Sequence, residues 1–140
     1  MLQLLATISA VLAVTFPQGT AVIRTPERSV TVKVELARTP DQLHTGLSGR
    51  STLAAKAGMA FLFGHDVREQ FWMKNTPIPL SIAFWGKGGK ILRILDMAPC
   101  LADPCMVYDP KVAFRGALEV NRGAFKRWHV RPGAVVTIRR

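Results

Sequence analysis

The chain has 140 residues, of which 49% are apolar, and it carries a formal net charge of +10. This length fits one domain with one sizeable core, and the apolar content excludes an intrinsically disordered chain. The positive charge favours contact with anionic surfaces or polymers, but no zinc-finger spacing, basic helix or aromatic RNA-binding signature indicates a specific nucleic-acid partner.

The N-terminal segment, residues 2–16, is apolar and uncharged. It is shorter than the roughly 20 residues that span a bilayer, and it fits a secretory signal peptide with Val11-Leu12-Ala13 as a cleavage site. No positive charge precedes Arg24, so an anchor or a first buried element is the alternative. We predict a signal peptide or anchor over residues 1–19, the one route to membrane association, and an exported single domain, periplasmic or extracellular, over residues 20–140.

Two β-rich stretches come next, residues 20–24 and 30–37, and the second alternates apolar and polar side chains as a half-buried strand does. Thr39, Pro40 and Gln42 then form a helix start. Thr39 can cap the helix, Pro40 suits its first position, and Gln42 can complete a capping box. The two glycines that follow limit this helix to about two turns.

The middle of the chain predicts a series of short strands. Residues 59–63 read as a buried strand that ends at Gly64-His65-Asp66, and residues 71–73 form a further short strand. Residues 80–85 and 90–96 form a hairpin around a glycine-rich turn.

The last third begins with a loop, residues 97–110, that holds both cysteines. A strand over residues 114–120, a helical segment over residues 122–128 and a final strand over residues 134–139 complete the chain. Seven or eight closely spaced strands with two short helices predict a mostly β fold, either a small antiparallel β-barrel or a β-sandwich.

The cysteines are Cys100 and Cys105, and an even count in an exported chain favours a disulfide. The loop that it closes is short, so the bond contributes only about 2 kcal/mol. A redox pair usually has two residues between the thiols, and a metal site needs ligands that His44, His65 and His129 do not offer nearby. We predict a disulfide, no metal and no cofactor.

Carboxylates are the candidate catalytic groups, because the chain has no Gly-x-Ser-x-Gly nucleophile elbow. Asp66, Glu69 and Glu119 could serve a small hydrolase if two of them face each other. The one sequence cluster of possible metal ligands consists of His65, Asp66 and Glu69. The simpler interpretation of these residues is a polar loop.

The segment from residue 71 to 80 is the densest cluster of specific side chains. In an extended chain Phe71 and Met73 face one side and Trp72 the other. Trp72 could stack on a sugar or another flat ligand, with Asn75 supplying hydrogen bonds. The alternative is that Trp72 packs in the core and Asn75 forms part of a turn.

Two further polar residues are binding candidates. Arg50 could hold an anion, or it could tie a loop to a carboxylate or to carbonyls. Glu119 alternates with apolar neighbours in a predicted strand, which favours a solvent-facing or arginine-paired position over catalysis. The basic residues that could bind an anionic polymer are Arg122, Lys126, Arg127 and Arg131.

The order of several motifs over about residues 30–138 is specific, although each motif alone is weak. They comprise residues 34–37 with 39–40, 46–47 with 50, 58–63, 71–76 with 79–80, 89–91, 99–100 with 105, 117–120, and 123. This order resembles the domain-of-unknown-function 192 family, small proteins of bacteria and archaea that are often exported. The resemblance implies a compact, mostly β fold and assigns no biochemical role.

The chain departs from the pattern that this resemblance implies at four positions. Ser48 stands where a methionine is expected, and His44 and Thr45 occupy a region where an arginine is usual. Ser81 replaces an expected aspartate. A catalytic or metal-binding aspartate at this position in relatives would be missing here, which weakens an enzymatic interpretation.

The leading hypothesis is a monomeric, non-catalytic binding or accessory module of the cell envelope. Its partner would be a small molecule or an envelope polymer. The ligand would lie near Trp72, Met73 and Asn75, with Arg50 and Glu119 as polar partners. The alternatives are the small hydrolase and the basic protein that binds anionic polymers.

Overall fold

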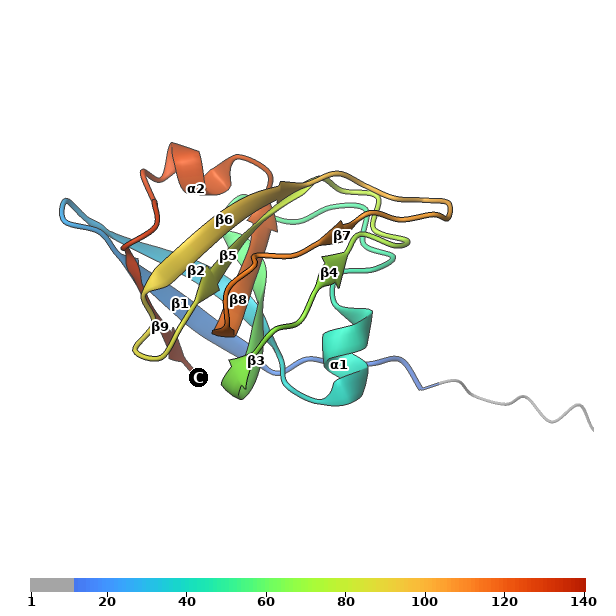
Figure 1. Ribbon diagram of the computed structural model, residues 1–140, viewed down its shortest axis with the longest axis horizontal. Coiled ribbons are helices and arrows are strands. Elements are labelled where there is room, and N and C mark those ends of the chain that lie inside the picture. Colours follow the sequence, from blue (N-terminus) through green and yellow to red (C-terminus); the bar gives the residue numbers. More distant parts are fainter. Residues whose placement is uncertain (1–11) are drawn as a thin grey trace, which may run out of the picture.

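The computed structural model describes residues 12–140, so most of the predicted leader lies outside the described residues. Figure 1 shows a strongly curved sheet with a helix at each of two separate places. In chain order the elements are β1 (Gln18–Arg24), β2 (Ser29–Ala37), α1 (Pro40–Thr45), β3 (Ala57–Val67), β4 (Phe71–Trp72), β5 (Leu80–Trp85), β6 (Ile91–Met97), β7 (Val107–Tyr108), β8 (Phe114–Asn121), α2 (Ala124–Arg127) and β9 (Val135–Arg139).

The main sheet has seven strands in the order β6-β5-β8-β3-β2-β1-β9, and β4 and β7 form a separate pair. All neighbours are antiparallel except β2 and β3, whose parallel pairing requires the crossover that contains α1. The edge strands β6 and β9 approach each other at one end, through a single bridge between Lys90 and Val135. The predicted mostly β fold is confirmed. The sheet curls but does not close into a barrel, so of the two alternatives the sandwich-like one fits.

Each face of the curled sheet buries its own hydrophobic core, and β8 contributes to both. Leu118 and Val120 face the inner core, which α2 covers with Phe125. Ala117 faces the second core, which α1, the β4–β7 pair and their loops cover. Because side chains alternate along a strand, Glu119 lies on the same face as Ala117.

The start of α1 follows the predicted capping box. The Thr39 hydroxyl accepts a hydrogen bond from the backbone N–H of Gln42 at 3.3 Å, and the Gln42 side-chain oxygen accepts one from the Thr39 N–H at 3.1 Å. Pro40 is the first helical residue, and Gly46 ends the helix with a φ of 48°. Short-range chemistry therefore sets both ends of this helix.

Two elements differ from the sequence prediction. The break predicted at residues 64–66 is wrong, because β3 continues to Val67 through an irregularity in its pairing with β8. A bulge lets a strand bend around extra residues without ending. The loop over residues 97–110 also contains β7, which pairs with Phe71 and Trp72 of β4.

The residues just before β1 join the fold as well. The backbone N–H of Leu36 donates to the carbonyl of Pro17 at 2.8 Å, and the Gln42 amide donates to the carbonyl of Thr15 at 2.9 Å. Phe16 packs against the second core. The part of the predicted leader that the structure describes is thus partly integrated with the domain.

Candidate functional site

A pocket of about 570 Å³ opens on the second core, between α1 with its following turn and the segment around β4. Figure 1 places α1 and the β4–β7 pair at the same end of the molecule, away from α2. The apolar part of the wall consists mainly of Leu43, Leu47, Phe61, Phe63, Phe71 and Met73. Segments far apart in the sequence therefore share one cavity.

Glu119 is the acidic residue of this pocket that lies deepest. Its side chain is 4% exposed, and its partners across the sheet are Met59 of β3 and Ile82 of β5. Within residues 12–140 no hydrogen bond or ion pair joins the Glu119 carboxyl group to another residue. The expectation of a solvent-facing or arginine-paired Glu119 is therefore wrong, because the elements above the sheet cover this position.

The environment of Glu119 controls its charge. Burial among apolar side chains raises the pKa of Glu119 from 4.5 to about 8, because the ionised form loses its hydration. In the described part of the chain, the side-chain oxygen atoms of buried residues either make a hydrogen bond or contact solvent. The carboxyl group, which makes no hydrogen bond, therefore opens on the pocket, and near pH 7 it carries a proton.

Trp72 lies at the mouth of the pocket with 44% of its surface exposed, while Met73 beside it is 1% exposed. Trp72 therefore does not pack in the core. The ring of Trp72 lies 6.4 Å from the ring of His44, and Lys74 Nζ lies 5.3 Å from the Trp72 ring centre. This rim presents an aromatic surface that already contacts a cation.

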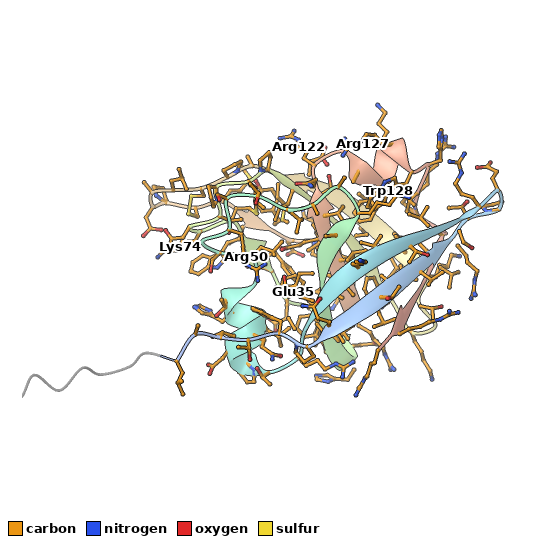
Figure 2. All side chains as sticks on the ribbon, turned by 180° about the vertical axis from the view of Figure 1, so that it is seen from behind. Glu35, Arg50, Lys74, Arg122, Arg127 and Trp128 are labelled. Carbon is orange, nitrogen blue, oxygen red and sulfur yellow. A yellow bond between two sulfur atoms is a disulfide. The ribbon has the colours of Figure 1, made fainter. Side chains whose placement is uncertain are left out.

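Two of the predicted ligand residues do not line this pocket. Arg50 makes a two-pronged ion pair with Glu35, with N–O distances of 2.8 and 3.0 Å (both residues are labelled in Figure 2). The hydrogen bond to Glu35 also raises the pKa of Arg50. Asn75 is exposed in a left-handed turn with a φ of 56°. Arg50 thus ties the loop after α1 to β2, and Asn75 serves the turn.

The three carboxylates proposed for hydrolysis separate into different places. Glu69 and Glu119 both line the pocket, Glu69 as an exposed residue and Glu119 as a buried one. Asp66 does not line it and pairs instead with Arg115 at 2.8 Å. Among residues 12–140 no three His, Cys, Asp or Glu side chains are grouped so that they could hold a metal ion.

The cysteine loop supports the segment that lines the pocket. Cys100 and Cys105 form the predicted disulfide, with their Cα atoms 5.8 Å apart. The Asn75 N–H donates to the Cys100 carbonyl at 2.9 Å, and the Cys100 N–H donates to the Met73 carbonyl at 3.3 Å. The disulfide therefore stiffens a loop that holds residues 71–76 in place.

Comparison with known proteins places the chain in a family. The family model DUF192, described as "Uncharacterized ACR", matches residues 21–138. The chain belongs to the DUF192 family. None of the curated proteins matches it.

Two solved structures share the fold of this DUF192 protein. A candidate transcription regulator from Sinorhizobium meliloti is 31% identical, with a TM-score of 0.83, over 90% of this chain and 97% of that one. A protein of unknown function from Novosphingobium aromaticivorans is 27% identical, with a TM-score of 0.80, over 91% of this chain and 94% of that one. The family and these neighbours establish the fold and assign no activity.

Three positions where this DUF192 protein departs from the expected motif pattern lie on the wall of the pocket. They are His44, Thr45 and Ser48, which belong to α1 and the turn after it. A serine leaves more open space than the methionine expected at position 48, and it adds a hydroxyl. These three residues therefore contribute to the shape and polarity of the pocket.

Ser81, the fourth departure, lies in a different cavity. This second pocket of about 580 Å³ lies beside α2, and Ser81 is 1% exposed. The Ser81 hydroxyl donates to Asp96 at 2.6 Å and accepts from the Gly123 N–H at 3.0 Å. Asp96 is the cross-strand partner of Ser81, so a carboxylate is present beside the position where an aspartate was expected.

The basic candidates for polymer binding gather around α2. Arg122, Lys126, Arg127 and Arg131 are all exposed. Figure 2 shows Arg122 and Arg127 beside α2, away from Lys74 and Arg50. Any polymer surface there is separate from the pocket over Glu119.

Sequence reasoning missed the wall that α1 and its turn provide, from Leu43 to Ser48. The only signal was the short helix itself, because nothing local indicates which sheet face it covers.

In residues 12–140 no helix is long and apolar enough to cross a membrane.

Proposed function

We propose that this DUF192 protein is a non-catalytic, monomeric module of the cell envelope that binds a small molecule in the pocket between α1 and β4. One observation carries the proposal, a buried and unpaired Glu119 that opens on a cavity of about 570 Å³. The Glu119 carboxyl group makes no hydrogen bond to another described residue, so a ligand in the pocket can form hydrogen bonds with it. Aromatic and aliphatic walls with a few polar groups are typical of small-molecule sites.

The cysteine pair supports the envelope location. Disulfides persist in oxidising compartments and are rare in the cytosol. The bond between Cys100 and Cys105 is consistent with export, and the apolar segment over residues 2–16 supplies a candidate signal. Fractionation of cells that express the full chain, combined with N-terminal sequencing, tests this part of the proposal.

A small-molecule screen by thermal shift tests the pocket. Compounds that raise the melting temperature of the wild type should lose this effect in Trp72→Ala, which removes the aromatic mouth, and in Glu119→Gln, which alters the floor. Lys126→Ala is the matched control, because Lys126 is exposed beside α2 and lines the other cavity. Hits that bind both pocket variants as well as the wild type would place the ligand elsewhere.

The second candidate is a small hydrolase, favoured by the presence of Glu69 and Glu119 in one pocket. Two carboxyl groups in different environments can divide acid and base roles. Glu69 is exposed at the rim of the pocket. This exposure favours a binding function over hydrolysis. Turnover of chromogenic esters or glycosides that disappears in both Glu69→Gln and Glu119→Gln would establish the hydrolase instead.

A further inference from the structure

The other ionisable side chains that line the pocket with Glu119 come from its rim. They are His44 on α1, Arg68 and Glu69 between β3 and β4, and Lys74 after β4. Met59 and Ile82, its neighbours on β3 and β5, and Val107 on β7 are apolar. Lys74 is engaged with Asp103 at 3.3 Å. In residues 12–140 no cationic group is bonded to the buried carboxyl group.

The aromatic side chains add a second preference for positive charge. Phe61, Phe63, Phe71 and Trp72 all line the cavity. The face of an aromatic ring carries partial negative charge and attracts cations, more strongly where water is excluded. Lys74 over the Trp72 ring shows that this rim accommodates a cation.

We propose that the ligand is a small organic ammonium ion. Its N–H groups donate to the Glu119 carboxylate, and its apolar body lies against Phe71 and Trp72. This inference rests on the proposed function, because it specifies the ligand of the same pocket. An ammonium ion meets both features of the cavity, because it forms a charge-assisted hydrogen bond with the Glu119 carboxylate and a cation–π contact with the aromatic wall, whereas a neutral ligand makes only an uncharged hydrogen bond to Glu119.

Such a ligand changes the protonation of the site. Glu119 is protonated near pH 7 in the unbound protein, since its pKa is raised to about 8. An ammonium ion binds the carboxylate, so binding near pH 7 releases one proton from Glu119. Affinity should therefore rise about tenfold per pH unit as the pH increases toward 8. An alkylamine stays charged over this range, because its pKa is about 10.

Three matched probes test the chemistry: 2-phenylethylamine, 2-phenylethanol and 3-phenylpropanoate. Each is titrated into the full chain by nuclear magnetic resonance between pH 6.5 and 8.5, with the Trp72 indole signal assigned through Trp72→Phe. The amine should bind most tightly and gain affinity with pH. Glu119→Gln should weaken it at least tenfold at pH 8.5. His44→Gln should keep the pH slope, because the proton that the amine displaces comes from Glu119.

Calorimetry gives an independent readout. Measured in two buffers of different ionisation enthalpy, binding of the amine at pH 7 should release close to one proton from the wild type and none from Glu119→Gln. The melting temperature of Glu119→Gln, equal to or above that of the wild type, verifies that the variant is folded.

The failures are distinguishable. Amine affinity that is flat or falls with pH, or that survives Glu119→Gln, would overturn the ammonium inference. Equal binding of the alcohol that is lost in Trp72→Ala would also overturn it, while the small-molecule pocket would stand. If none of the three probes binds at pH 8.5, the ammonium inference is wrong, and the broader screen decides the proposed function separately.

Discussion

At the scale of single residues, Glu119 links the pocket to the pH dependence of stability. Its pKa in the folded protein is about 8, against 4.5 for an ordinary glutamate, so the folded state holds its proton more tightly than the unfolded state. The stability that this proton brings is fully present below about pH 4.5 and is lost as the pH rises to about 8. The upper limit of the loss is roughly 4–5 kcal/mol.

Replacing Glu119 with glutamine removes this titration. The free energy of unfolding of Glu119→Gln should fall less between pH 5 and pH 9 than that of the wild type, and the difference should grow with pH. Urea denaturation at several pH values measures it, and the other titrating groups cancel in the comparison. Parallel stability curves for the two proteins would show that Glu119 is hydrated in solution.

Ser48 is one of the residues that line the pocket. In Ser48→Met a longer side chain enters the cavity from the turn after α1, so affinity for any ligand of the pocket should fall about tenfold or more. Stability should change by less than about 1 kcal/mol, because the position is only partly buried. Ser48→Ala is the control, since it removes the hydroxyl without filling the cavity; binding lost equally in both variants would implicate the hydroxyl instead.

At the scale of elements, the ion pair between Arg50 and Glu35 holds the pocket wall against the sheet. The two side chains are 37% and 22% exposed, so solvent weakens their attraction. Arg50→Lys keeps the charge and loses the two-pronged geometry, which should cost about 0.5–1 kcal/mol. A double-mutant cycle with Glu35→Gln by chemical denaturation measures the coupling, and a coupling near zero would contradict a role in holding the wall.

The disulfide loop should matter more for the pocket than for the fold. The double variant Cys100→Ser with Cys105→Ser should lose no more than about 2 kcal/mol, because the closed loop is short. Amide exchange should accelerate over residues 71–76, which hydrogen-bond to the loop, and stay slow over β8. Acceleration spread evenly over the sheet would show that the disulfide supports the whole fold.

At the scale of the whole molecule, the sequence predicted what neighbouring residues determine. The Thr39 cap, the strand at residues 80–85 and the opposite sides taken by Trp72 and Met73 follow from local pattern and appear in the structure. The burial of Glu119 does not, because it depends on α1 and the β4–β7 pair, which cover the sheet from distant parts of the chain. The position of a residue in an alternating strand specifies the sheet face on which its side chain lies. Only the complete fold specifies which elements cover that face.

The pairing of β1 with β9 has a consequence for folding during synthesis. Thr20 pairs with Arg139, so the first and last strands of the sheet are neighbours. The growing chain cannot complete its sheet until β9 has left the ribosome, and long-range pairing of this kind forms slowly. A chain that ends at residue 134 should remain protease-sensitive however long it is left to refold.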